Sequence, residues 1–152
     1  DDVEHADHDG SASPDRVYRY YSMLQEKVGM TEKQIVHFHT TRGWGLANVL
    51  AALQAGMTHY ESTMGGIGGQ PANFVDGVPV AGTGSYYYKD PNLVGLVSTE
   101  DLVVMLDEMG IETNLDIDKV LEIGTMNERI LGRRLRSEAI KNGRIPKSLT
   151  GR

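Results

Sequence analysis

Residues 34–48, "QIVHFHTTRGWGLAN", contain the strongest fold signal in this chain. An apolar run ends in two histidines one residue apart, and a glycine-containing turn then leads into a segment rich in alanine and leucine. This pattern is typical of a short buried strand followed by a helix. Residues two apart in a strand project from the same face, so His37 and His39 are expected to point together and Phe38 to point the other way.

The pair His37 and His39 has two interpretations. Two imidazoles at this spacing can hold one divalent ion, each through one ring nitrogen. Two polar residues held in a strand by packing and hydrogen bonds would give the same pattern. The spacing alone therefore leaves both open.

Strands and helices alternate over the first part of the chain. Short strands are expected at residues 2–6, 34–39 and 58–63, and the apolar positions between them recur at helical spacing over residues 13–29 and 45–55. Strand, helix, strand, helix, strand in this order implies parallel strands joined by right-handed crossovers. The predicted fold class is α/β.

The later part of the chain begins with about thirty residues rich in glycine and proline, 64–97, which we expect to form a lid or a binding loop. Helices are predicted after Ser98, which stands three residues before Asp101 as in a capping box, and over residues 117–131. Ser13 is expected to cap the first helix in the same way.

Composition and charge narrow the functional classes. The chain has no cysteine, which excludes disulfides and thiolate metal sites, and its net charge is −6. Residues 133–152 are nonetheless basic: such a tail can bind nucleic acid or a phosphorylated cofactor, or it can be a solvated, partly helical tail.

No apolar run could span a bilayer and no export signal is visible, so we expect no membrane partner and a cytoplasmic location. The first residue is not methionine, which suggests the later part of a longer polypeptide.

Three expected strands bring functional groups to one edge of the sheet. In parallel α/β folds ligands bind beyond the C-terminal ends of the strands, and Asp7, His37, His39 and the glycine-rich turn at 65–69 all follow such ends. Asp7 can be a third metal ligand or can orient a ligand histidine. The alternative is that Asp7 belongs to the loop that enters the following helix.

The segments "HFHTTRGWGLANVLAALQAG", "GGIGGQP" and "STEDLVVMLDEMGIETNLDIDKVLE" resemble the 3-hydroxy-3-methylglutaryl-CoA lyase family, which also includes acyl-condensing enzymes. The resemblance covers residues 6–122 and implies a TIM (β/α)8 barrel, of which the chain is the C-terminal portion, about strands 6 to 8, with C-terminal helices. On this basis residues 1–132 belong to the barrel and residues 133–152 form a basic, partly helical tail. A whole barrel needs about 250 residues, so the N-terminal part of the same barrel is an expected partner.

The resemblance also implies site residues. His37 and His39 would be metal ligands, with His37, Asp7 and Gln70 in catalysis. Gln70 stands where the lyase has a loop cysteine, Thr40 where it has an acid, and Leu96 where it has a metal-binding asparagine. Residues implied in substrate binding are Arg42, Thr63, Gly68, Gly69 and Asn92.

The function implied is a carbon–carbon lyase that cleaves a 3-hydroxyacyl-CoA through an enolate, with a divalent metal ion (Mg, Mn or Zn). A homodimer without nucleic acid or membrane partners is expected. The replacements at Gln70, Thr40 and Leu96 keep an alternative open, in which a related barrel runs another aldol or Claisen reaction or only binds a ligand. A third hypothesis is an independent doubly wound domain that binds a partner through its basic tail.

Overall fold

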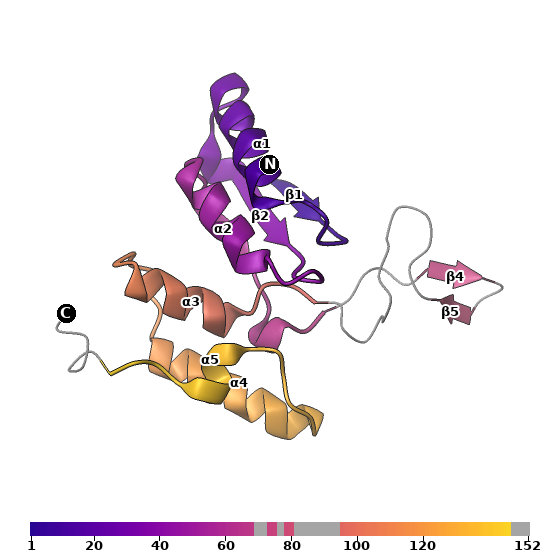
Figure 1. The fold of residues 1–152 in the computed structure, drawn as a ribbon, viewed down its shortest axis with the longest axis vertical. Helices are drawn as coiled ribbons and strands as arrows, with labels where there is room; N and C mark the ends of the chain where they lie inside the picture. Colours follow the sequence, from indigo (N-terminus) through magenta and orange to yellow (C-terminus); the bar gives the residue numbers. More distant parts are fainter. Residues whose placement is uncertain (69–72, 76–77, 81–94, 147–152) are drawn as a thin grey trace. The chain divides into compact units, whose positions relative to one another are not determined.

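A computed structural model describes residues 1–68, 73–75, 78–80 and 95–146. The chain divides into two compact units (Figure 1). The first contains residues 1–62 and 68–97, and the second contains residues 63–67 and 98–152.

The first unit is built on the three-stranded parallel sheet that the sequence predicts. Its strands are β1 (Val3–Asp7), β2 (Gln34–Phe38) and β3 (His59–Glu61), in the order β1-β2-β3. Each strand lies within about a residue or two of its expected bounds. In the register, Ala6 pairs with His37, and His37 pairs with Glu61 on the other side.

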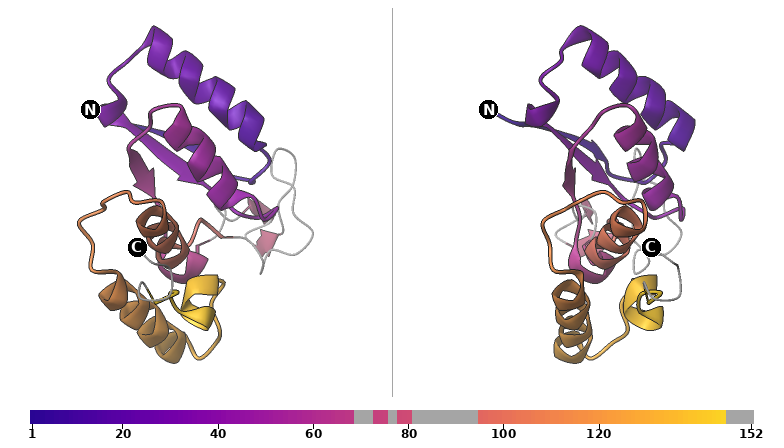
Figure 2. Two further views of the ribbon diagram at one scale, coloured as in Figure 1. Left: turned by 60° about the vertical axis from the view of Figure 1, so that its left-hand side comes forward. Right: turned by 90° about the vertical axis from the view of Figure 1, so that its left-hand side faces the viewer.

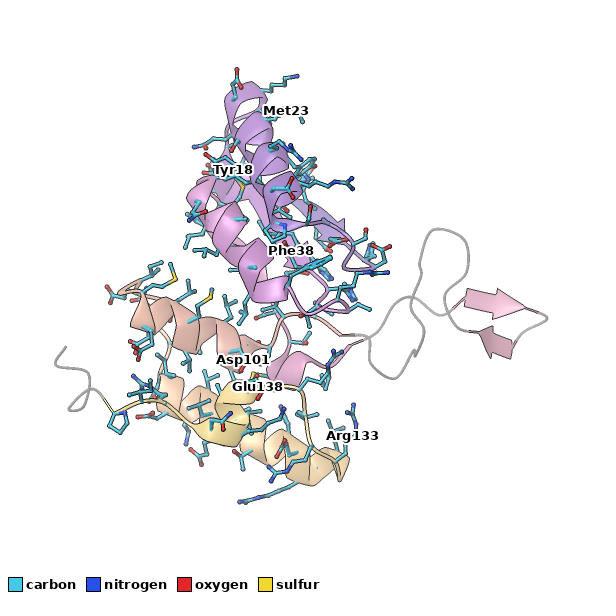
Figure 3. The ribbon with its side chains drawn as sticks, in the orientation of Figure 1. Tyr18, Met23, Phe38, Asp101, Arg133 and Glu138 are labelled. Atoms are coloured by element: carbon cyan, nitrogen blue, oxygen red, sulfur yellow. The ribbon has the colours of Figure 1, made fainter. Side chains whose placement is uncertain are left out.

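Two helices, α1 (Pro14–Lys27) and α2 (Gly45–Gln54), lie side by side on one face of this sheet (Figure 2). Val36 and Phe38 of β2 are both buried, and the ring of Phe38 lies edge to face with that of Tyr21 in α1 (Figure 3). A 3-10 turn, η1 (Thr31–Lys33), leads from α1 to β2. Ser13 does stand at the start of α1, but its side chain accepts no cap bond, and its hydroxyl donates to the Asp15 carboxylate.

The glycine- and proline-rich segment after β3 differs in part from the loop that was predicted. It contains a 3-10 turn, η2 (Met64–Gly66), and an antiparallel pair of short strands, β4 (Asn73–Val75) and β5 (Val78–Val80). The predicted site residues Gly69, Gln70 and Asn92 lie outside the described residues.

The second unit is helical. Besides η2 it holds α3 (Thr99–Glu108), α4 (Ile117–Leu131) and α5 (Glu138–Asn142), so the predicted helices are confirmed, including one in the basic tail. The Ser98 side chain caps α3 by accepting from the Asp101 amide, as expected. Asp101 in turn accepts from Ser137 and Ala139, which places α3 beside the start of α5 (Figure 3). Among the described residues no helix has both the length and the apolar character to cross a bilayer.

A buried carboxylate lies at the centre of the second unit. Glu100 is fully buried, and its Oε2 accepts hydrogen bonds from the Gly65 amide and the Ser98 hydroxyl, each at 2.7 Å. Helix α4 passes next to this carboxylate at Gly124. A Cβ added there would lie 2.4 Å from Glu100 Oε1 and 2.7 Å from Ile140 Cδ1. Only glycine fits at this crossing without displacing its neighbours.

We predict that Gly124→Ala lowers the free energy of unfolding by about 1–3 kcal/mol, because the added methyl overpacks a site fixed by hydrogen bonds. Helix propensity alone would give the opposite sign, since alanine is favoured over glycine in a helix by about 1 kcal/mol. Urea unfolding followed by circular dichroism measures the difference, with the exposed Arg129→Ala in the same helix as the control. A stabilised Gly124→Ala variant would show that the crossing can relax.

Candidate metal centre

The register of the sheet places a row of polar side chains on the face opposite α1 and α2. Paired residues of neighbouring parallel strands project to the same side, and successive residues alternate. His37 therefore shares its face with Glu61 on β3, its direct partner, and with Glu4 on β1, two residues before its partner Ala6. His39, two residues after His37, continues this face beyond the end of β2.

Three imidazoles meet at the C-terminal end of the sheet. His8, which follows β1, has its ring centre 5.7 Å from that of His37 and 5.9 Å from that of His39. The rings of His37 and His39 are stacked, with centres 5.2 Å apart. One ring nitrogen from each histidine lies within 4.8 Å of the other two, a spacing that could hold a metal ion. The structure thus brings together the two predicted ligands and adds a third histidine.

Two carboxylates fix the orientation of His37. Its Nδ1 lies 2.9 Å from an oxygen of Glu4 and 2.9 Å from an oxygen of Glu61. A ring N–H that donates to a carboxylate leaves the other nitrogen as the one with a free electron pair, which is the usual support for a metal-binding histidine. Nε2 of His37 is buried and has no hydrogen-bond partner among the described residues.

His39 is held in its neutral form. Its side chain is only 2% exposed, and its Nδ1 likewise has no partner in the part of the chain that the structure describes. Burial, together with repulsion from His37 and His8, lowers the pKa of His39 from its usual value of 6.5 to about 4. A neutral imidazole with an unshared buried nitrogen is the form that binds a metal ion. The residues present therefore fit a divalent ion.

Asp7 has a different environment from the histidines. It pairs with Phe38, so it belongs to the helix-covered side of the sheet, and its carboxylate accepts from the backbone amides of Ser11 and Ala12 at 3.1 Å each. Burial raises the pKa of Asp7, although these two bonds oppose the rise. These contacts match the loop role that the sequence left open. Its carboxylate is not among the described groups that could share an ion with His37 and His39.

The other predicted site residues are spread over the two units. Arg42, which is exposed, donates to the backbone carbonyl of Asp9, next to His8, and so lies near the histidine cluster. Thr63 belongs to the second unit, where its hydroxyl donates to the Ile67 carbonyl. Gly68 is exposed and has a φ of 115°, a backbone conformation that glycine adopts readily.

Sequence reasoning did not single out His8 or Glu4. The first strand was expected to end at residue 6, whereas β1 runs to Asp7. The faces of neighbouring strands can be matched only when the register is known, and the register is set by packing on both sides of the sheet. A histidine one residue after an aspartate at a strand end was the only signal for His8.

Comparison with known proteins places this geometry in a family. Residues 2–126 match the family described as HMGL-like. The chain belongs to the HMGL-like family. It is 32% identical over 132 residues to the hydroxymethylglutaryl-CoA lyase of Bacillus subtilis, and the match covers 87% of this chain and 38% of the relative. It is 37% identical over 102 residues to the mitochondrial hydroxymethylglutaryl-CoA lyase of Arabidopsis thaliana, and that match covers 67% of this chain and 18% of the relative.

Solved structures support the same assignment. The HMGL-like chain superimposes on an HMG-CoA lyase from Acinetobacter baumannii, solved in complex with coenzyme A and 3-methylmalate, with a TM-score of 0.76 and 34% identity, over 95% of this chain and 44% of that one. For the HMG-CoA lyase of Bacillus subtilis the TM-score is 0.73 and the identity is 31%. This superposition covers 92% of this chain and 41% of that one. The chain spans less than half of the length of each of these relatives.

The HMGL-like chain is thus a portion of a TIM barrel, as predicted, and not an independent doubly wound domain. In a TIM barrel the helices form the outer ring, the opposite face of the strands lines the interior, and active sites lie at the C-terminal ends of the strands. The face that carries Glu4, His37 and Glu61 is therefore the interior face. The three histidines lie at the end of the sheet where this fold carries out chemistry.

We predict that His39 in the metal-free protein makes stability fall as the pH decreases. The unfolded chain takes up a proton near pH 6.5 and the folded chain only near pH 4. Stability should therefore be unaffected by His39 above about pH 6.5, decrease between pH 6.5 and pH 4 by an amount of the order of 3 kcal/mol, and level off below. Urea unfolding at several pH values, with a chelator present, measures this pH dependence for the unchanged protein and for His39→Phe. An equal pH dependence in the variant would contradict the assignment.

Proposed function

We propose that the protein to which this chain belongs is a metal-dependent carbon–carbon lyase that cleaves a 3-hydroxyacyl-CoA or a related hydroxy acid. The observation that carries the proposal is the pair of buried ring nitrogens of His37 and His39, unpartnered in the described residues, at the C-terminal end of barrel strands. The family supports the reaction class, since the relatives are named hydroxymethylglutaryl-CoA lyases. The ligands of the Acinetobacter baumannii structure support the substrate class.

In this proposal His37 and His39 hold the divalent ion through neutral imidazole nitrogens. When bound, the ion supplies polarisation of the substrate's hydroxyl and carbonyl oxygens and stabilisation of the enolate. The carboxylates of Glu4 and Glu61 keep the His37 Nδ1 proton in place, so that Nε2 faces the site. His37 could also pass a proton to one of these carboxylates, a role that competes with holding the ion.

The remaining site residues have proposed roles that follow the resemblance. Arg42, exposed near the histidines, would meet a carboxylate or phosphate of the substrate. Thr63, Gly68, Gly69 and Asn92 would contribute to substrate binding, and Gln70 would supply a hydrogen bond in the loop. Asp7 would act by fixing the loop that carries His8, through its two bonds to backbone amides.

We propose that further strands of the same barrel pair beside β1 and β3, because an exposed sheet edge is otherwise open to pairing with other chains. A homodimer and a cytoplasmic location stay predictions. Among the relatives, the rat enzyme is named cytoplasmic and the chicken enzyme mitochondrial.

A second candidate function has one observation in its favour. The backbone of Leu96, which is buried, forms an isolated antiparallel β-bridge with that of His39, so an apolar side chain lies next to the candidate ligand. Together with Thr40 and Gln70, this favours either an aldol or Claisen reaction on a different acid or a protein that only binds such a ligand. The two functions differ in product formation from 3-hydroxyacyl-CoA esters.

We predict that His39→Ala in the full-length protein removes stoichiometric binding of a divalent ion and lowers turnover of 3-hydroxyacyl-CoA esters below detection. Elemental analysis and titration with Zn²⁺ and Mn²⁺ measure the first effect, and product assays over a panel of esters measure the second. His59→Ala is the matched control, because His59 is an exposed histidine on the face of β3 that also carries Glu61. Retained ion in His39→Ala would overturn the metal site. A protein that keeps its ion but forms no product would favour the second candidate.

We further predict that removing the charges behind His37 weakens the site without abolishing it. Glu61→Gln should lower metal affinity several-fold, since Glu4 can still accept from Nδ1, and the double change of Glu4 and Glu61 to Gln should lower it by about 10- to 100-fold. Isothermal titration gives the affinities, with the exposed Glu26→Gln as the control. Affinities equal to those of the unchanged protein would show that the carboxylates do not orient His37.

A further inference from the structure

We propose that His8 is a third protein ligand of the ion assigned to His37 and His39, and that this three-imidazole set selects a zinc-like ion over magnesium. The inference rests on the proposed function only for the assignment of a metal ion to His37 and His39. It adds a ligand from the turn that follows β1.

The spacing of the three rings matches a single ion. An ion held tetrahedrally at about 2.1 Å by ring nitrogens separates the ring centres by roughly 5 Å. The ring of His8 is centred 5.7 Å from His37 and 5.9 Å from His39, and those two are 5.2 Å apart. Small side-chain rotations would close the triangle, since one nitrogen of each ring already lies within 4.8 Å of the others.

The burial of His39 points to a ligand in this triangle. With 2% of its side chain exposed, its Nδ1 has lost water and gains no hydrogen bond from the described residues. An unpaired buried polar atom destabilises the folded state. An ion shared with His37 and His8 would satisfy His39 and would also relieve the crowding of three basic rings.

The backbone that follows His8 is fixed to the segment that follows His39. The indole of Trp44 donates to the Gly10 carbonyl at 3.1 Å, and the amide of Asn48 donates to the Ala12 carbonyl at 2.8 Å. Both donors come from the start of α2, at the same end of the sheet as the histidines. The position of His8 is therefore set by the fold, as a preformed ligand requires.

Gly10 shows how closely the two segments pass. Its φ is +63°, and a Cβ added to it would lie 2.9 Å from the backbone carbonyl of His39. A side chain at this position would push the His8 loop away from β2. Glycine here permits the approach that brings His8 into contact range of His39.

The composition of the cluster indicates which ion it prefers. Three imidazoles suit zinc, cobalt or nickel, whereas magnesium prefers oxygen ligands in octahedral geometry and keeps several waters. Glu4 and Glu61 are occupied with Nδ1 of His37, and Leu96 beside His39 offers no ligand atom. Three nitrogen ligands with an open fourth position are also the arrangement of catalytic zinc sites.

The test compares metal selectivity in the full-length protein after removal of metal with a chelator. Affinities for Zn²⁺, Co²⁺ and Mg²⁺ are measured by titration for the unchanged protein, His8→Ala, His39→Ala and the control His59→Ala, and the visible spectrum of the Co²⁺ form reports the number of nitrogen ligands. His8→Gln, which keeps much of the side-chain volume, is used if circular dichroism shows that His8→Ala does not fold.

We expect His8→Ala to lose more than about 100-fold in Zn²⁺ affinity, since loss of an outer-shell partner alone costs about 10- to 100-fold, and to change its Co²⁺ spectrum. Its Mg²⁺ affinity and the behaviour of His59→Ala should not change. If His8→Ala keeps the Zn²⁺ to Mg²⁺ ratio and the Co²⁺ spectrum while His39→Ala loses the ion, the inference on His8 is overturned and the proposed metal site stands. If the folded, unchanged protein binds none of the three ions, both are overturned.

Discussion

The parallel register of β1, β2 and β3 is the constraint on which the candidate site depends. Because Ala6 pairs with His37 and His37 with Glu61, the residues that alternate with them share one face. A slip of β1 by one residue would carry Glu4 and His8 to the helix-covered side. The slip is opposed because it would carry His5 away from α1, where its ring lies edge to face against Tyr20 and Tyr21. The packing on one side of the sheet thus fixes the polar grouping on the other.

The two faces of this sheet impose opposite demands on adjacent residues. Phe38 is buried beneath the helices, while His37 and His39 on either side of it project into what a complete barrel would enclose. The two histidines nevertheless differ. His37 contacts two carboxylates, which orient its ring, whereas His39 lies among other imidazoles and beside Leu96, where its ring is shielded from water. The histidines and the two carboxylates all come from residues 4–61, a continuous segment of the first unit.

Much of this arrangement could be predicted from the sequence. The strand and helix order followed from hydrophobic periodicity and from glycine at the ends of helices, and the family followed from motifs around His37 and after Ser98. The neighbours of His37 could not be predicted, because contacts across strands depend on a register that no local pattern encodes. Ser13 shows the same limit, since its hydroxyl donates to Asp15 and accepts no cap bond, an outcome that the local sequence does not decide. The hairpin β4-β5 lay within a segment whose glycine and proline content masked its short strands.

Glu4 and Glu61 lie on the two strands that flank β2, yet both approach the same nitrogen of His37. One proton cannot neutralise two carboxylates, so the outer strands of this sheet face each other with uncompensated negative charge across the middle strand. A positive ion seated at the histidines would balance that charge and draw β1 and β3 toward β2. Binding of an ion at the histidines would therefore strengthen the association of all three strands.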